Sequence, residues 1–450
     1  VGPSQVDPRT GEILDADIGF FHTVMNLARN WYFVQAGNVD PQAAKLPLPD
    51  ALMGELLRYI AAHEVGHSLG FPHNWKSSSF YPVDSLRSMS FTQKYGDEAS
   101  IMDYGRFNYI AQPGDGASPM PKVGPYDMFA VEWGYRPIFD AKTPDDERET
   151  LNRIAARQET EPYLRFGVSD ANDPTVQTED LGDDAVKATT YGLKNLRAIT
   201  KRLIPATTEA GKDYSTLREI YGEIWGQRNR ELGHVANYVG GVIRTQRIAG
   251  QEGVVHTPVS RAKQKEAMTY LKKEGFTTPA DFLAPEVLVL IEPTGSVDRV
   301  AAGHRSLLNI LLNNDRMARL VNTTALTQKE RPYTLSEMLA DLRDCVWTEL
   351  SAAHVAPDVY RRGLQRMHVD MIGTKLGPAP APFTPPGAPP GFVIVSTPLP
   401  GEARALLRLE LKDLDAAITR VIPKAADRET RAHLEDTRLQ IKDFLDPEEK

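Results

Sequence analysis

The first forty residues contain two different hydrophobic patterns. Apolar and polar side chains alternate over residues 13–20, a period of two that predicts a half-exposed β-strand. From Phe20 to Val34 the apolar residues instead recur every three or four positions, as they do on one face of an α-helix. The pattern therefore predicts a strand that leads directly into a helix.

A second helix is predicted in the segment that follows. Asp50 is the candidate N-cap and Gly70 the expected stop. One face of this helix carries residues at helical spacing, which are Leu52, Leu56, Ile60, His63 and His67. Two histidines therefore lie on the same face of the predicted helix as the apolar residues.

The pattern changes again after this helix. Residues 74–125 lack long periodic runs and are rich in Ser, Gly, Pro and Asp, which predicts surface loops. Beyond about residue 135 most apolar residues are three, four, seven or eight positions apart, which predicts helices. Thr334 and Glu337 form a capping box that marks the start of one of them.

A proline-rich segment interrupts the helical pattern near the end of the chain. Residues 377–400 hold nine of the 33 prolines, too many for a helix or a central strand, and predict an extended linker or strap. Helical periodicity returns in residues 401–450. We expect these C-terminal helices to pack on the preceding helical region.

Composition excludes several classes of function. The 450 residues include 52 Lys and Arg against 60 Asp and Glu, and no basic face stands out, so nucleic acid is not an expected partner. No run of about 18–20 apolar residues is present, so no transmembrane segment is predicted. The single cysteine, Cys345, is expected to be a small buried core residue, and any metal must be held by histidines and carboxylates.

The start of the chain also shapes the expectations. It begins with Val1, and nothing near that end resembles the charged and apolar regions of a signal peptide. We therefore expect a fragment or processed form whose targeting signal has been removed.

The most informative stretch is residues 63–73, which follows the pattern His-Glu-x-x-His-x-x-Gly-x-x-His. His63 and His67 are four positions apart, so on a helix they can bind one ion, while Glu64 is rotated toward the open coordination position. Gly70 can adopt a left-handed conformation that brings His73 back as a third nitrogen ligand. Three protein ligands leave a fourth position for water, as in a catalytic zinc site.

Alternatives to this ligand set remain open. A bare His-Glu-x-x-His also occurs in helices with two ordinary histidines, although Gly70 and His73 make that interpretation much weaker. Glu98 or Glu132 could instead complete a site of two histidines and one glutamate, with His73 as a loop residue.

A second motif follows 29 residues after His73, where Met102 lies in the sequence Ser-Ile-Met-Asp-Tyr. At this spacing it resembles the Met-turn of metzincins, a methionine placed beneath the metal site. The following residues are similar to the Met-turn of astacins, and that resemblance implies that Tyr104 is an auxiliary ligand or a donor to the transition state. A packed aromatic residue is the alternative for Tyr104.

Further segments extend the resemblance. Residues 81–88, 100–109, 123–135 and 179–188, together with the histidine motif, resemble a family of large bacterial zinc-dependent metalloproteases. Asn74 stands where an astacin has Glu, so the chain is not an astacin proper. The family resemblance implies export to the periplasm, the cell surface or the extracellular space.

The resemblance implies an α+β fold class and a domain order. A metzincin-like catalytic domain with a mixed sheet and the active-site helix is expected over residues 1–137, and a mainly helical domain over residues 138–376. The linker of residues 377–400 and the helices of residues 401–450 follow. About 50 residues precede the active-site helix, fewer than a metzincin upper subdomain usually needs. We therefore expect an incomplete upper sheet and a missing N-terminal segment of the same precursor.

The expected function is zinc-dependent cleavage of peptide bonds in a peptide or protein substrate. One Zn²⁺ is the expected cofactor, and Glu64 is expected to act as general base and then general acid. A catalytically silent zinc-binding scaffold and a zinc exopeptidase or amidase are the alternatives. The strand of residues 13–20 could pair with an extended substrate, or could equally be an interior strand without a free edge.

Calcium is a second possible cofactor. An acidic group with oxygen ligands consists of Asp170, Asp173, Glu179, Asp180, Asp183 and Asp184. It lacks the spacing of an EF-hand, and the last two residues also have an explanation as the start of a helix.

Overall fold

The protein is described by a computed structural model. It describes residues 4–168, 170–292, 294–326, 331–378, 382–384, 389 and 397–446. Most of the proline-rich segment 377–400 lies outside these residues, so the linker stays a prediction. The chain divides into two compact units: the first comprises residues 1–234, 244–256 and 281–293, and the second comprises residues 235–243, 257–280 and 294–450.

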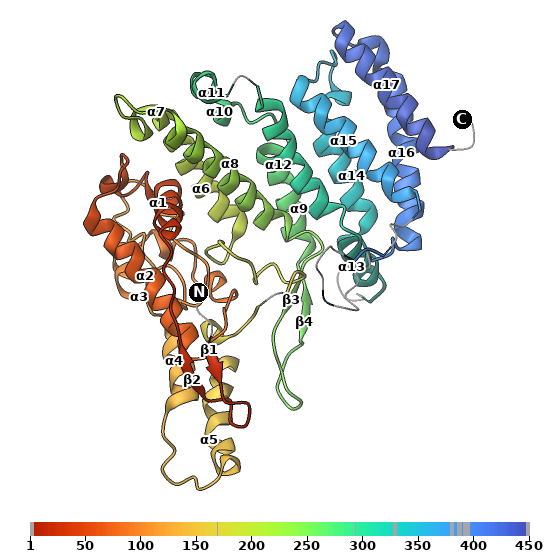
Figure 1. Ribbon diagram of the computed structural model, residues 1–450. Helices are drawn as coiled ribbons and strands as arrows, with labels where there is room; N and C mark the ends of the chain where they lie inside the picture. The colour runs from red at the N-terminus through yellow and green to blue at the C-terminus, as the bar shows by residue number, and fades with distance from the viewer. Residues whose placement is uncertain are drawn as a thin grey trace. The chain divides into compact units, whose positions relative to one another are not determined.

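The first unit is mostly helical (Figure 1). Its longer helices are α1 (Thr23–Ala36), α2 (Asp50–Ser68), α4 (Pro125–Tyr135), α5 (Pro144–Ala156), α6 (Ala185–Lys201) and α8 (Ser215–Ala236). Its shorter ones are α3 (Met89–Tyr95), α7 (Leu203–Thr207) and α11 (Pro285–Ile291), and α10 (Ala280–Leu283) begins at its border.

The expected mixed sheet is not present among the described residues. β1 (Ser4–Val6) and β2 (Ile13–Ala16) form an antiparallel pair, and β3 (Val242–Arg244) and β4 (His256–Pro258) form a second two-stranded sheet. The predicted strand 13–20 therefore ends at Ala16. The chain then continues to α1, and no third strand joins the sheet of β1 and β2. Within the described residues β2 keeps one unpaired edge, so the interior-strand alternative is wrong.

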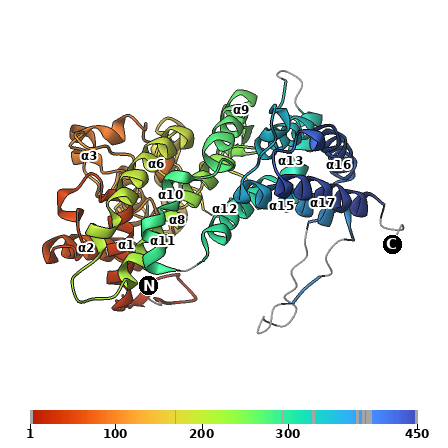
Figure 2. The ribbon, with the colours of Figure 1, turned by 90° about the horizontal axis from the view of Figure 1, so that it is seen from above.

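The two predicted helices near the N-terminus are present. α1 begins at Thr23, three residues later than its apolar pattern, and packs against α2 (Figure 2). Asp50 is the first residue of α2 and not its N-cap, because Pro49 has the extended conformation of the capping position. The carboxylate of Asp50 still lies in the first turn, where it complements the helix dipole.

A hydrophobic cluster between α1 and α2 holds α2 in place. It includes Tyr32, Leu52, Leu56, Met102 and Phe107. Leu56 is fully buried, which contributes about 1.5–3 kcal/mol relative to exposure. The same stripe that faces this cluster continues into the histidines, so core packing fixes their direction.

Residues 74–125 are mainly irregular, as predicted, apart from α3 and short 3₁₀ turns, but residues 96–112 are mostly buried, so the prediction that they lie on the surface is wrong there. Their core is completed by later parts of the chain, because Tyr109 and Ile110 share a buried cluster with Leu181 and Ala188. The compact unit that carries the histidines therefore continues past residue 137, the predicted end of the catalytic domain.

The second unit is built from helices. These are α9 (Arg261–Tyr270), α12 (Ser296–Leu311), α13 (Asn314–Leu326), α14 (Leu335–Val346), α15 (Val359–Leu376), α16 (Gly401–Val421) and α17 (Arg428–Leu445). α15, α16 and α17 pack against one another. Thr334 and Glu337 form the predicted capping box of α14. Cys345 is buried, as predicted, and burial raises the pKa of its thiol to about 12.

No helix in the described part of the chain is both long and apolar enough to span a membrane.

Candidate metal centre

α2 presents two histidines on one face, one turn apart. The rings of His63 and His67 have centroids 4.8 Å apart. His63 Nδ1 lies 2.6 Å from the carbonyl oxygen of Ile101, and His67 Nδ1 lies 2.8 Å from that of Phe71. Because a carbonyl can only accept, each Nδ1 carries the proton, which leaves both Nε2 atoms as lone-pair donors.

The turn after α2 returns the third histidine to the first two. The N–H of Gly70 donates to the carbonyl of His67, and the N–H of Phe71 donates to that of Gly66, which is a Schellman motif. Gly70 has a φ of +87°, a left-handed conformation that favours glycine. The chain thereby reverses direction and runs back toward the end of α2.

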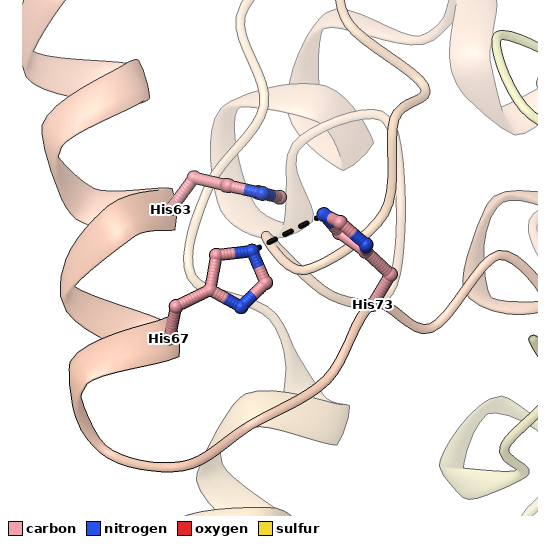
Figure 3. Close-up of side chains that lie close together, drawn as sticks. All are labelled: His63, His67 and His73. Carbon is pink, nitrogen blue, oxygen red and sulfur yellow. Dashed lines mark hydrogen bonds between the residues drawn. The ribbon is translucent and has the colours of Figure 1, made fainter. Parts of the chain in front are cut away.

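The three imidazoles converge (Figure 3). His67 Nε2 and His73 Nε2 are 3.1 Å apart, and one nitrogen from each histidine lies within 4.8 Å of the others. His63 is 4% exposed, and its Nε2 is buried without a hydrogen-bond partner. A buried nitrogen lone pair that faces two further imidazoles fits a metal ion that prefers nitrogen ligands. This group could hold a metal ion.

Burial disfavours the charged form of His63 and of His73. Burial lowers the pKa of His63 to about 4, and the positive charges that His67 and His73 would carry lower it further. Burial also lowers the pKa of His73. Neutral imidazole is the form that binds metal, so the free lone pairs are available at neutral pH.

The loop predicted to be a Met-turn packs against α2. Met102 is 1% exposed and packs against Gly66, where an added Cβ would lie 2.1 Å from the methionine sulfur. The N–H of Asn74 donates to the Met102 carbonyl at 3.0 Å. The loop thus orients the His63 ring through the carbonyl of Ile101, and it anchors the segment of His73 through the hydrogen bond from Asn74.

The first turn of α4 fixes the Met-turn. The Asp127 carboxylate accepts hydrogen bonds from Ser100 Oγ at 2.5 Å, from Ile101 N at 2.9 Å and from Gly124 N at 2.6 Å. Burial raises the pKa of Asp127, although the three hydrogen bonds act to lower it. Gly66 and Asp127 were not among the predicted site residues. The Gly-Pro-Tyr-Asp start of α4 was the available signal for Asp127.

Tyr104 and Glu64 line the same pocket as His63. The Tyr104 ring centroid is 4.4 Å from that of His73 and 5.2 Å from that of His63. Burial raises the pKa of Tyr104, and the negative charge of Glu64 raises it further. Glu64 lies one position along α2 from His63 and is half-buried.

An apolar pocket of about 540 Å³ opens beside Glu64. Its lining includes His63, Glu64 and Tyr104. Its walls come from the residues just before α1, from α1 and from α2, and they include Phe20, Phe21, Val24, Leu27, Trp31, Tyr59 and Ile60. Arg106 closes one side, with its guanidinium 3.4 Å from the centre of the Trp31 ring and 2.5 Å from Glu179. The pocket can therefore receive a large apolar group next to the histidines.

The carboxylates considered as alternative third ligands point elsewhere. Glu98 is fully buried and accepts a hydrogen bond from Gly105 N at 2.9 Å, and Glu132 forms ion pairs with Arg136 and Arg157. Neither belongs to the histidine group, which within the described residues is the one group of three or more candidate ligands.

Glu98 is part of a buried acidic cluster behind the Met-turn. Burial raises the pKa of Asp97 and of Glu98 well above their usual values, and the negative charge of Asp103 raises both further. Burial also raises the pKa of Asp103, to about 7. Asp103 accepts hydrogen bonds from Ser77 Oγ and Ser78 N. Hydrogen bonding thus makes Asp103 a structural tie between two loops.

The predicted calcium site is not supported. Its members lie in separate interactions: Asp173 pairs with Lys76 at 2.8 Å, Glu179 with Arg106 and Arg230, and Asp184 caps α6. No oxygen-ligand group forms among the described residues.

Comparison with known proteins identifies a family. A protein-family model described as Met-zincin matches residues 45–354. No curated protein and no solved structure matches the chain. The matched range contains all three histidines, the Met-turn and α4.

Proposed function

Because the chain belongs to the Met-zincin family, we propose that it is a zinc-dependent metalloendopeptidase with Glu64 as its general base. The observation that carries the proposal is the convergence of His63, His67 and His73 around a buried, unpartnered Nε2, directly beside Glu64. Three neutral nitrogen ligands would leave one position open, as catalytic zinc sites require.

His63, His67 and His73 would hold the ion, and Ile101 and Phe71 orient two of the rings by hydrogen bonds. When bound, zinc supplies Lewis acidity that polarises the scissile carbonyl and makes water acidic near neutral pH. An imidazole binds metal in its uncharged form, so three such ligands would not cancel the positive charge of the ion. The protein therefore provides a fixed set of ligands without a counter-charge of its own.

Glu64 moves the protons. In this proposal its carboxylate accepts a proton from the attacking water and returns it to the nitrogen of the departing amine. Tyr104 lies against His63 and His73 with a raised pKa, so its hydroxyl stays protonated and can donate a hydrogen bond to negative charge developing on the carbonyl oxygen. Met102 is a positioning residue that supports α2.

The pocket beside Glu64 supports a preference in the substrate. Its aromatic and aliphatic walls would bury a large apolar side chain next to the scissile bond, and each such side chain gains about 1.5–3 kcal/mol on transfer from water. β2 keeps an unpaired edge in the described residues and could add an extended substrate strand.

The proposal is tested by metal analysis together with a peptide-library digest. Purified full chain is expected to contain one zinc ion and to cut peptides internally, next to large apolar residues. Bound zinc without any cleavage would favour a silent scaffold. Release of single terminal residues would favour an exopeptidase.

Export is a further part of the proposal. It is supported by the resemblance to large bacterial metalloproteases that are typically exported. Fractionation of cells that express the full-length gene would test it, with recovery in the cytoplasm as the contrary result.

A further inference from the structure

A second pocket lies in the same compact unit, and its lining does not include the histidines or Glu64. Its volume is about 680 Å³. Its walls come from the end of α5, from the segment of residues 158–166 and from the hairpin tip of residues 244–255. The charged side chains in its lining are Lys76, Glu159, Arg165, Arg244 and Arg247.

Two of these charges are already engaged. Lys76 Nζ lies 2.8 Å from Asp173 Oδ2, and both side chains are almost fully buried, so this pair is neutral as a unit. Glu159 accepts a hydrogen bond from Gln251 across the pocket. Three arginines therefore remain against one carboxylate, which gives the pocket a net positive charge.

No ion pair forms at these three arginines among the described residues. Arg165 uses only its Nε, which donates to the carbonyl of Gln158 at 3.2 Å. Arg247 has a buried Nε without a hydrogen-bond partner, packed against Gly253, where an added Cβ would lie 3.2 Å from that nitrogen. The remaining guanidinium donors of both residues are available to a ligand.

Arg165 and Arg247 also repel each other. Burial lowers the pKa of Arg165, and the positive charge of Arg247 lowers it further. Two guanidinium groups held close together cost free energy unless an anion lies between them. The paired N–H donors of a guanidinium group match the two oxygens of a carboxylate. The resulting charge-assisted hydrogen bonds are stronger than hydrogen bonds between neutral groups.

We propose that this pocket binds the carboxylate side chains of an acidic peptide segment. That the ligand is a peptide rests on the proposed function. The pocket is also tied to the loop of the third histidine, because Asn74 Nδ2 donates to the Arg165 carbonyl and Asn74 Oδ1 accepts from Gly167 N, both at 3.0 Å. Phe166, Ile248 and Val255 supply apolar walls for the stems of acidic side chains.

Binding is tested apart from catalysis. The full chain carrying Glu64→Ala is titrated with a fluorescent ten-residue peptide that contains four glutamates, and with the same peptide in which glutamine replaces them. Fluorescence anisotropy should show about tenfold or tighter binding of the glutamate peptide at low salt, and the preference should shrink at high salt.

The variants locate the site. Arg165→Gln with Arg247→Gln should abolish the preference, and Arg244→Gln should reduce it without disturbing buried packing, because Arg244 is exposed. Arg148→Gln is the matched control, because Arg148 is exposed and pairs with Asp145 on α5. A thermal melt of each variant confirms that it is folded.

Three results would overturn the proposal: equal binding of the two peptides, a preference that survives loss of the arginines, or inorganic phosphate stabilising the protein through these arginines while the glutamate peptide does not bind. Competition of phosphate with a bound glutamate peptide supports the proposal. Cleavage is scored separately. A wild type that shows the charge preference without hydrolysing any peptide contradicts the proposed function and leaves this site intact.

Discussion

Gly66 determines how closely the Met-turn approaches the metal-site helix. It lies between His63 and His67 on α2, and its missing side chain makes room for the sulfur of Met102. The spacing of the histidine motif identified the three imidazoles because α-helical periodicity alone brings two of them together. It could not identify Gly66, because the contact that requires glycine comes from a loop 36 residues further along the chain.

Gly66→Ala should therefore be destabilising. Its Cβ would lie 2.1 Å from the sulfur of Met102, so this buried side chain, which is 1% exposed, would have to shift within the core. Despite the better helix propensity of alanine, we expect a net loss of about 1–3 kcal/mol in the free energy of unfolding, with weaker zinc binding. Chemical denaturation and a zinc titration measure the two effects.

Gly54→Ala on the same helix is the matched control. Nothing lies within 4 Å of a Cβ built at Gly54, so this variant should gain about 0.5–1 kcal/mol. If the two variants are equally stable and bind zinc equally, Met102 does not pack on the helix as described.

At the scale of elements, α4 anchors the loop that carries Met102. Its first turn places Asp127 under Ser100 and Ile101, and Ile101 in turn holds the ring of His63. The apolar pattern predicted where helices lie, because period is a local property. It did not predict that the first turn of α4 would bind the loop of Met102, since this depends on contacts between residues far apart in the sequence.

Asp127→Asn should loosen this connection. The amide nitrogen of asparagine would replace a carboxylate oxygen that now accepts hydrogen bonds from backbone N–H groups. A buried donor would then lose its partner, which should lower the free energy of unfolding by about 1–3 kcal/mol. We expect a lower melting temperature and weaker zinc affinity. Asp145→Asn, at a side chain that is 83% exposed, should change neither. Normal zinc affinity in a folded Asp127→Asn protein would show that α4 does not position the site.

At the scale of the whole chain, the prediction of mostly helical structure after residue 135 is confirmed, whereas a mixed sheet was wrong for the described residues. The alternation over residues 13–20 does not show how long the strand is. Its end depends on which of these residues form hydrogen bonds with a neighbouring strand. The compact unit around the site likewise depends on late residues such as Leu181, whose role no local pattern shows.

Buried histidines should make the stability of the protein depend on pH. His234 on α8 donates from Nε2 to the Thr178 carbonyl, and burial lowers its pKa to about 4, with Arg230 lowering it further. In the unfolded chain its pKa is about 6.5. Between these values the unfolded state binds a proton that the folded state does not, so the free energy of unfolding falls as pH decreases from about 6.5 to about 4.

His234→Gln keeps a donor for Thr178 but does not titrate. Between pH 7 and pH 5 the wild type should lose up to about 2 kcal/mol more than this variant. Denaturant titrations at both pH values measure the difference. Identical pH dependence of the two proteins would mean that folding does not change the pKa of His234.

The decisive experiment for the zinc mechanism is peptide hydrolysis by zinc-loaded Glu64→Ala. Its histidines are unchanged, so it should retain zinc, and without the general base its kcat should fall by at least about a hundredfold. His67→Ala should lose zinc and cleavage together. A Glu64→Ala protein that binds zinc and cleaves peptides at the wild-type rate would contradict the proposed role of Glu64 and with it the mechanism.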